Sequence, residues 1–538
     1  MAFVAAPGPG ASGGPPSAHR GPSGGPGLCR GGPGGEAAGA RGLPLAGRRL
    51  PGGGPLGLGV PRRLPAAVRG VLPVRVLLVT HDHPFRGRSG VASYCADLLT
   101  ELRGRGHEVA CLYSAERDWT FRPHLRTSVE RGVQILGLVN SPVPPALSVD
   151  RPEQDGSDPR LERLFTRCLK TVRPDIVHVH AFQGFVGTVV PLARGAGCPV
   201  VVTLHDFWAL CARMSLVRPD GAPCEGPNGG VNCARFCADR HRSRRRLYRR
   251  LLALLPPGSV RFWVERAGSA YVRSASRDPW TPPVSSDGGV RTDLAGAYGG
   301  RAARLLASLR EAHRILAVSR FVAEVYRRHG VAADRLEVLP LGLRISDEVR
   351  WRLREASPPV RFGYLGRLVP HKGAHVLAQA AYGIPPERAR FLFFGPAAHE
   401  ARAYLQRLAG GRPLEFYGPY RREDLPRILQ EIDVAVVPTL FQETAGLTAL
   451  EPQAAGIPVI ASATGAIPEW VQDGENGLLF PPGDAAALRD RLLRITEEPA
   501  IVARLSAKTK RPQSIRAHVE RLLAIYDACL AQRRAFHV

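Results

Sequence analysis

Short apolar segments of strand length alternate with helical segments twice along the chain, and this alternation limits the fold more than any other feature of the sequence. The run VRVLLVT at 74–80 is continuously apolar apart from one arginine and a final threonine. Such runs are typical of strands that are buried on both faces of a sheet. Alternation of buried strands with helices indicates a doubly wound parallel sheet, so we expect an α/β protein.

The two alternations predict two Rossmann-like domains, at 71–318 and 336–510. A final helical segment at 511–538 is expected to pack back on the first domain. Residues 1–70 are rich in glycine, proline and arginine, and they are expected to be disordered because they contain too little apolar surface to offset the entropy of ordering. Ligands of open parallel sheets bind beyond the carboxyl ends of the strands, so two facing sheets predict a deep cleft between the domains.

The composition narrows the class of partner. The chain has 538 residues and a formal net charge of +26, which would favour nucleic acid or an anionic surface. Lysine is rare among the 73 basic residues, however, and glycine and proline number 59 and 49. This bias is typical of a GC-rich genome. A basic nucleic-acid-binding protein therefore stays an alternative supported by charge alone, without a recognisable binding module.

The sequence also bears on location. No uninterrupted apolar run approaches the roughly 18 residues of a membrane-spanning helix. The first residues lack the basic head and apolar stretch of a signal peptide, so we expect a cytoplasmic protein. The basic amphipathic stretch at 240–257 either rests on the inner face of the membrane or forms a solvated helix face.

The segment GRLVPHKG at 366–373 predicts an anion site. It sets Arg367 and Lys372 on a loop that leads from a strand into a helix beginning near Gly373. An arginine can bridge phosphate oxygens bidentately, and a lysine acts as a point charge beside the positive end of the helix. The alternative is an ordinary surface pair in an arginine-rich protein.

The segment FQETAGLTALEPQAAG predicts the rest of that site. A helix that starts near Gly446 would point the free N–H groups of Gly446, Leu447 and Thr448 at a phosphate. Glu443 precedes this helix and Glu451 lies in its second turn, so both carboxylates can face one bound molecule. A carboxylate that accepts from two vicinal hydroxyls suits a ribose or a hexose. The alternative is helix capping together with a solvated glutamate.

Histidines and cysteines mark the first domain. His178 and His180 share one face of a predicted strand, as structural histidines or with His180 reaching the cleft. A loop directly after the segment TLHDFW contains four cysteines, which predict either a structural zinc that shapes the acceptor side or free, partly buried thiols. These cysteines are Cys211, Cys224, Cys233 and Cys237.

The ordered set of motifs carries a family resemblance. GRLVPHKG, the pair Glu443 and Glu451, AAGIPVIAS, GAIPE and DGENGLLFPPGD follow one another in the expected order. Over about 73–533 the chain resembles the retaining nucleotide-sugar glycosyltransferases of glycosyltransferase family 4. These proteins have the GT-B fold, in which two Rossmann-like domains face each other across a deep cleft.

The resemblance implies roles for individual residues. Arg367 and Lys372 would bind the donor diphosphate and stabilise its charge during transfer, and Glu443 would contact the hydroxyls of the transferred sugar. His205, in TLHDF, would lie near the reacting sugar as the fourth catalytic residue. The other implied donor-binding positions are Gly90, Gly366, Gly418, Tyr420, Gly446, Leu447, Thr448 and Glu451.

The resemblance also implies an activity. It predicts a hexosyltransferase that moves a sugar from a UDP- or GDP-sugar to a glycan or lipid-linked acceptor, with retention, in polysaccharide biosynthesis. The chain contains no D-x-D, so a carboxylate-held metal is not expected and no cofactor is required for catalysis. A nucleotide-sugar epimerase or a sugar phosphorylase of the same fold is the alternative within enzymes.

Overall fold

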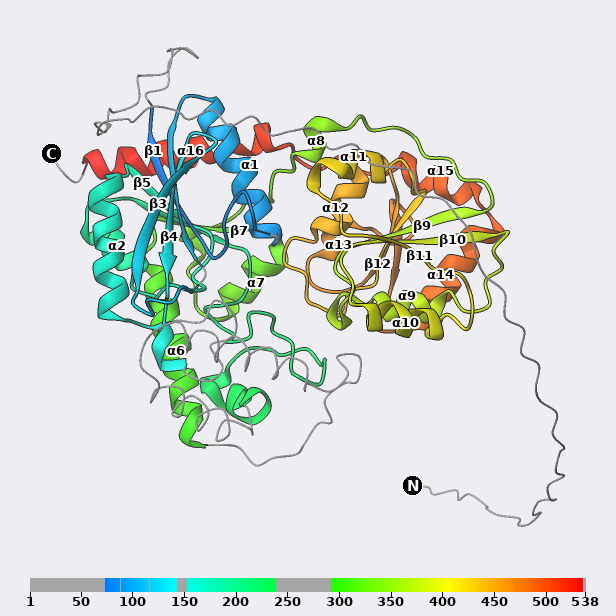
Figure 1. Cartoon of the computed structure of the whole chain (residues 1–538), viewed down its shortest axis with the longest axis horizontal. Coiled ribbons are helices and arrows are strands. Elements are labelled where there is room, and N and C mark those ends of the chain that lie inside the picture. The colour runs from blue at the N-terminus through cyan, green and yellow to red at the C-terminus, as the bar shows by residue number, and fades with distance from the viewer. Residues whose placement is uncertain (1–72, 88, 116, 143–151, 239–291, 536–538) are drawn as a thin grey trace, which may run out of the picture. The chain divides into compact units, whose positions relative to one another are not determined.

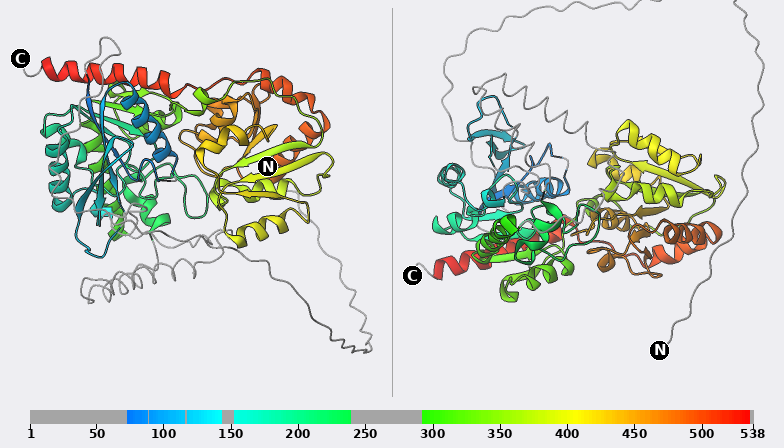
Figure 2. Two further views of the ribbon diagram at one scale, coloured as in Figure 1. Left: turned by 45° about the horizontal axis from the view of Figure 1, so that its top comes forward. Right: turned by 90° about the horizontal axis from the view of Figure 1, so that it is seen from below.

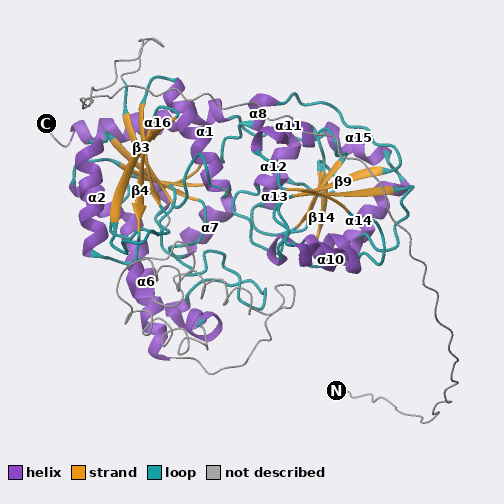
Figure 3. Cartoon of the chain, in the orientation of Figure 1, coloured by secondary structure: helices purple, strands orange, loops and turns teal. Residues whose placement is uncertain are grey.

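A computed structural model describes residues 73–87, 89–115, 117–142, 152–238 and 292–535, and all of these belong to one compact unit. The segment at 1–70 and the basic stretch at 240–257 lie outside the described residues. The described chain contains two sheets with helices on their faces (Figures 1 and 3). We call the parts of the chain around them the first lobe and the second lobe.

The first sheet has eight strands in the order β3-β4-β2-β1-β5-β6-β7-β8. All neighbouring strands are parallel except β3 and β4, which are antiparallel. The strands are β1 (Arg75–Thr80), β2 (Glu108–Ser114), β3 (His124–Glu130), β4 (Val133–Val139), β5 (Ile176–Val179), β6 (Val200–Leu204), β7 (Arg314–Ala317) and β8 (Leu336–Val338).

The second sheet is parallel throughout and has the order β11-β10-β9-β12-β13-β14. The chain order reverses between β9 and β12, which is where a doubly wound sheet opens a crevice for a ligand. The strands are β9 (Val360–Leu365), β10 (Ala389–Phe394), β11 (Glu415–Gly418), β12 (Val434–Val437), β13 (Val459–Ser462) and β14 (Gly477–Phe480).

Two features of the first sheet correct the sequence prediction. The edge strand β3 was not predicted, because its residues are mostly exposed and its sequence HLRTSVE has no buried run. Strand β8 pairs with β7, so residues 336–338 belong to the first sheet and the predicted start of the second domain at residue 336 is too early. The boundary was misplaced because pairing between strands is not visible in local sequence.

Helices cover the faces of both sheets (Figure 3). Those of the first lobe are α1 (Gly90–Gly104), α2 (Pro159–Val172), α3 (Val189–Gly195), α6 (Thr292–Arg310) and α7 (Arg320–Arg328). The helices that follow in the chain are α8 (Ile345–Glu348), α9 (Ala374–Ala380), α10 (His399–Leu408), α11 (Leu425–Ile428), α12 (Leu447–Ala454), α13 (Ile467–Trp470), α14 (Ala485–Glu497), α15 (Ala500–Ala507) and α16 (Ile515–Ala535).

Each lobe has its own hydrophobic core. The central strands β1, β5 and β6 are buried over nearly their whole length, as expected for a parallel sheet covered on both faces. Separate clusters of buried apolar side chains fill the two faces of the second sheet. Among the described residues, none of the helices combines the length and apolar character that spanning a bilayer requires.

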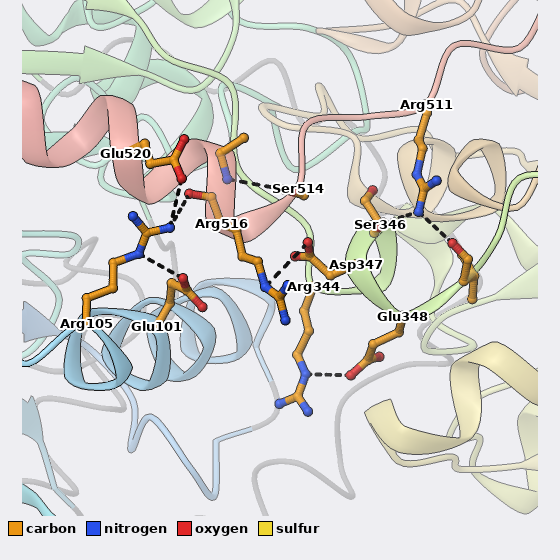
Figure 4. A network of polar contacts seen from close by, with 12 residues as sticks. Glu101, Arg105, Arg344, Ser346, Asp347, Glu348, Arg511, Ser514, Arg516 and Glu520 are labelled. Carbon is orange, nitrogen blue, oxygen red and sulfur yellow. Dashed lines mark hydrogen bonds and ion pairs between the residues drawn. The ribbon is translucent and has the colours of Figure 1, made fainter. Parts of the chain in front are cut away.

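The last helix returns to the first lobe. Val519, Leu522 and Tyr526 of α16 are fully buried in the core of the first lobe, and α16 lies beside α1 (Figure 2). A polar network surrounds the start of α16, where Arg105 of α1 bonds the Arg516 carbonyl and Glu520 (Figure 4). The chain thus crosses back from the second lobe before it ends.

Candidate functional site

The loop after β9 positions Lys372. A short 3-10 turn at Pro370–Lys372 leads through Gly373 into α9. Gly373 has a φ of +73°, and a Cβ there would lie 1.6 Å from the carbonyl oxygen of Pro438, so only glycine fits. This close approach sets the loop after β9 against the chain that leaves β12, at the crevice of the second sheet.

Glu443 meets Lys372 in that crevice. The Glu443 carboxylate lies 2.6 Å from the Lys372 ammonium and accepts a hydrogen bond of 3.2 Å from the Thr439 hydroxyl. Glu443 is buried, whereas about a third of the Lys372 side chain is exposed. The ammonium therefore keeps an open side for an anion while it neutralises the glutamate.

The Glu443 loop also contacts His205 of the first lobe. The Thr444 hydroxyl donates a 2.7 Å hydrogen bond to the His205 backbone carbonyl. His205 follows β6, and burial lowers the pKa of its imidazole to about 3, with His81 and His518 acting in the same direction. The ring is therefore neutral near pH 7. Three residues predicted to be catalytic, Lys372, Glu443 and His205, are thus joined through successive contacts.

Two helix N-termini lie side by side near these residues. Helix α12 starts after Gly446, whose φ is +67°, so Leu447 and Thr448 are its first residues. Gly90 opens α1, and a Cβ added there would lie 3.1 Å from a Leu447 methyl group. Both helix ends carry free N–H groups and positive partial charge, which is the environment that a diphosphate requires.

Arg367 and the glycines occupy the same edge of the second sheet. Arg367 is exposed, and within the described residues the structure records no ion pair for its side chain. The N–H of Gly366 donates to the Phe394 carbonyl, and the Gly418 carbonyl accepts from Gly395. The ends of β9, β10 and β11 are therefore held together by backbone bonds, and the Arg367 guanidinium stays available to an anion.

Glu451 is a second buried carboxylate of the site. Burial raises its pKa and the nearby Asp97 raises it further, while Arg422 opposes both effects. Within the described part of the chain no hydrogen bond to the Glu451 carboxylate is recorded. Its negative charge in turn helps to raise the pKa of Tyr420, which is mainly raised by burial. Glu451 and Tyr420 are thus neighbours.

Several residues of this region were missed by the sequence prediction. Arg422, which influences Glu451, is 2.8 Å from Asp97 of α1, so this arginine links the surroundings of Glu451 to the first lobe. Glu469, in the GAIPE segment, accepts from the backbone N–H groups of Arg320 and Phe321 at the start of α7. A carboxylate inside an apolar motif was the only available signal, and it did not reveal the partner because the two groups are far apart in sequence.

The four cysteines are close enough to influence one another electrostatically. Burial raises the pKa of Cys233 and Cys237 to about 12, and the nearby cysteines raise it further. All four are free thiols, and two of them, Cys233 and Cys237, lie in a short π-helical turn. Among the described residues, no three His, Cys, Asp or Glu side chains are arranged to hold a metal ion. The zinc site therefore stays a prediction.

Solved structures share this fold. Sucrose-phosphate synthase from Thermosynechococcus elongatus aligns with a TM-score of 0.51 at 19% identity, over 86% of this chain and 98% of that one. The Anabaena protein HepE, solved in complex with UDP and glucose, aligns with a TM-score of 0.51 at 16% identity, over 84% and 99% of the two chains. At these identities the likeness establishes the fold, which is GT-B.

Family profiles match both lobes. The profile described as "Glycosyltransferase Family 4" matches residues 88–261, and the profile described as "Glycosyl transferases group 1" matches residues 359–498. Together they cover more than half of the sequence. The chain is a GT4-like member of the GT-B glycosyltransferases. Both Lys372 and Glu443 of this GT4-like chain lie within the range of the second profile.

The GT4-like chain aligns with only part of the length of its curated relatives. D-inositol 3-phosphate glycosyltransferase of Mycolicibacterium smegmatis is 33% identical over 182 residues, which are 32% of this chain and 41% of the relative. Sulfoquinovosyl transferase SQD2 of Arabidopsis thaliana is 33% identical over 144 residues, 26% of this chain and 27% of the relative. The match thus spans half or less of each of these relatives.

Proposed function

We propose that the protein transfers a hexose from a UDP- or GDP-sugar to a glycan or lipid-linked acceptor, with retention at the anomeric carbon. The observation that carries the proposal is the contact series from Lys372 through Glu443 and Thr444 to His205. It joins a cation at the proposed diphosphate position, a carboxylate suited to sugar hydroxyls, and the backbone of His205, whose imidazole is neutral.

In the proposed reaction the bond between the anomeric carbon and the diphosphate oxygen breaks, and a bond from the acceptor oxygen forms on the same face. The acceptor proton goes to the leaving diphosphate. Arg367 and Lys372 stabilise the charge that develops on the diphosphate, together with the N-termini of α1 and α12. Glu443 holds the sugar hydroxyls, and its ion pair with Lys372 fixes the position of the carboxylate.

The acceptor is a separate question. A relative named for transfer to D-inositol 3-phosphate supports a phosphorylated polyol as one acceptor to test beside glycans and lipid-linked sugars. Contact with a membrane through residues 240–257 remains a prediction, as does a location in the cytoplasm. We also propose that transfer needs no metal ion, since the sequence lacks the D-x-D that holds one in many transferases.

Thermal stabilisation tests the donor site first. Melting temperatures are measured with UDP, GDP, ADP and their sugar conjugates, for the wild type, Arg367→Ala and the control Arg504→Ala. Arg504 is an exposed arginine of α15 that forms an ion pair with Glu498, so its substitution leaves the proposed site intact. A ligand that binds only the folded state raises the melting temperature. At a ligand concentration of 100 times Kd, the free energy of unfolding rises by about 2.7 kcal/mol.

We expect one nucleotide series to stabilise the wild type and Arg504→Ala but not Arg367→Ala. Incubation with the stabilising donor and each acceptor in the presence of EDTA then tests transfer, and NMR of the product reports the anomeric configuration. Conversion of the donor without an added acceptor would favour an epimerase, and dependence on inorganic phosphate would favour a phosphorylase. Salt-sensitive binding of DNA or RNA without any nucleotide effect would favour the nucleic-acid alternative.

A further inference from the structure

Two histidines of the segment DIVHVHAF have different surroundings. Both ring nitrogens of His178 are bonded within the protein, Nδ1 to the Tyr526 hydroxyl at 2.6 Å and Nε2 to the Thr203 hydroxyl at 2.7 Å. His180 has one bond, from Nδ1 to Nε2 of His205 at 3.1 Å. Nε2 of His180 is buried and has no hydrogen-bond partner among the residues that the structure describes.

This difference fixes the proton positions. Burial lowers the pKa of His180 well below its ordinary value, so His180 and His205 are both neutral, and each ring has one donor and one acceptor nitrogen. If Nδ1 of His180 accepted, its Nε2–H would be a buried donor without an acceptor, which proteins rarely tolerate. Nδ1–H of His180 therefore donates to Nε2 of His205, and the proton of His205 lies on Nδ1.

The neighbouring rings hold this arrangement. His178 lies 3.9 Å from His180 between ring centroids, and the Tyr94 ring lies 5.6 Å from His180 and 5.4 Å from His205. The backbone of His205 is held by the Thr444 hydroxyl of the Glu443 loop. The imidazole of His205 is thus restrained at its backbone, at Nε2 and along its faces, and Nδ1 is the nitrogen left for a ligand.

We propose that His180 is a positioning residue that holds His205 in the Nδ1–H tautomer, so that His205 donates a hydrogen bond to an oxygen of the transferred sugar. This inference rests on the proposed function for its sugar, but the tautomer is a property of the protein alone. His180 itself does not contact the donor. It acts through His205 and thereby selects which ring nitrogen of His205 carries the proton.

NMR of the full-length protein labelled with 15N-histidine tests the tautomer directly. The His205 signals are assigned by comparison with His205→Asn. We expect Nδ1 of His205 to be protonated and Nε2 to be unprotonated in the wild type. Protonated Nε2 in the wild type would overturn the inference. Because this measurement needs no substrate, an absence of transferase activity would count against the proposed function and would leave the tautomer result to decide the inference.

Kinetics test the consequence. His180→Leu removes the donor at similar bulk, His180→Asn places an amide N–H near the position of Nδ1, and Tyr526→Phe removes only the bond to His178. We expect kcat to fall about 10- to 100-fold in His180→Leu with donor KM changed less than about 3-fold, and to recover in His180→Asn. Tyr526→Phe should keep the wild-type kcat. If His180→Asn and Tyr526→Phe lost as much kcat as His180→Leu, the proposal would be contradicted. A wild-type kcat in folded His180→Leu would contradict it as well.

Discussion

At the scale of single residues, Glu443 has two protein partners on one carboxylate oxygen, the Lys372 ammonium and the Thr439 hydroxyl. In the proposed function its other oxygen accepts from hydroxyl groups of the bound sugar, so Glu443 serves the sugar and not the nucleotide. Substitution of Glu443 should therefore affect the sugar of the donor and leave the binding of the nucleoside diphosphate nearly unchanged.

We expect Glu443→Gln to lower kcat about 100-fold or more while the affinity for the free nucleoside diphosphate changes less than about 3-fold. The amide keeps the shape of the side chain but loses the charge that pairs with Lys372 and accepts from sugar hydroxyls. Calorimetric titration with the diphosphate and steady-state kinetics measure the two effects. Glu415→Gln is the control, since Glu415 is paired with Arg390 on the same sheet. Equal loss of diphosphate binding and turnover would contradict this role.

Asp97 gives a pH prediction. Burial raises its pKa from 3.8 to about 6, although Arg422 and Arg344 oppose the shift. The folded state thus binds this proton more tightly than the unfolded state, and the stability contributed by the proton is full below about pH 4 and is lost as pH rises through about 6. Asp97→Asn cannot ionise, so its melting temperature should fall less than that of the wild type between pH 4 and 7. Parallel curves for the two proteins would contradict the assignment.

At the scale of elements, the helices of the site begin where glycines allow the chain to turn. Gly373 and Gly446 both have positive φ just before α9 and α12, but their surroundings differ. A Cβ on Gly373 would collide with the Pro438 carbonyl, whereas a Cβ on Gly446 would meet its nearest atom, in Trp470, at 3.4 Å. Gly373 is needed because a side chain has no room there. Gly446 is needed because its backbone has a positive φ.

We therefore expect Gly446→Ala to cost about 1–2 kcal/mol of unfolding free energy, the penalty of a left-handed conformation for an L-residue. Gly373→Ala should cost considerably more, because backbone atoms must move as well. Urea unfolding of both variants measures the difference, and nucleotide-induced stabilisation reports on the site. Similar free energies of unfolding for the two variants would contradict the distinction.

Helix α7 shows how one lobe completes an element of the other. Ser319 accepts from the Val322 N–H inside the first lobe, and Glu469 of the second lobe accepts from the N–H groups of Arg320 and Phe321. These bonds satisfy donors that a helix start leaves unpaired. Glu469 of the GAIPE segment thus has structural partners at the start of α7.

At the scale of the whole molecule, the last described helix packs in the lobe that contains the first described strand. His518 of α16 accepts from the Tyr94 hydroxyl at 2.7 Å and donates to the Pro340 carbonyl at 2.9 Å. The partners Tyr94 and His518 are 424 residues apart. The first lobe therefore depends on the last helix for part of its core.

We expect Leu522→Ala in α16 to cost about 2–5 kcal/mol, the usual cost of truncating a buried leucine. Arg521→Ala, at the exposed neighbouring position, should cost less than about 0.5 kcal/mol. Hydrogen exchange of α1, against which α16 lies, should accelerate in the first variant. Equal stability of the two variants would mean that α16 contributes no core packing.

The alternation of apolar strands with helices predicted both sheets, and the motifs after β9 and β12 predicted the crevice residues Arg367, Lys372 and Glu443. These features are local, because burial on both faces of a strand and the start of a helix leave marks within a few residues of sequence. The edge strand β3 left no such mark, since most of its side chains are exposed.

Only the tertiary structure decided which distant groups meet. Thr444 bonds His205 across 239 residues of sequence, and His180 and His205 come together because β5 and β6 are adjacent in the sheet. The partner of Glu469 was decided in the same way. A sequence records the character of each side chain, whereas contacts between segments depend on strand order and chain crossing, which the packing of the whole chain determines.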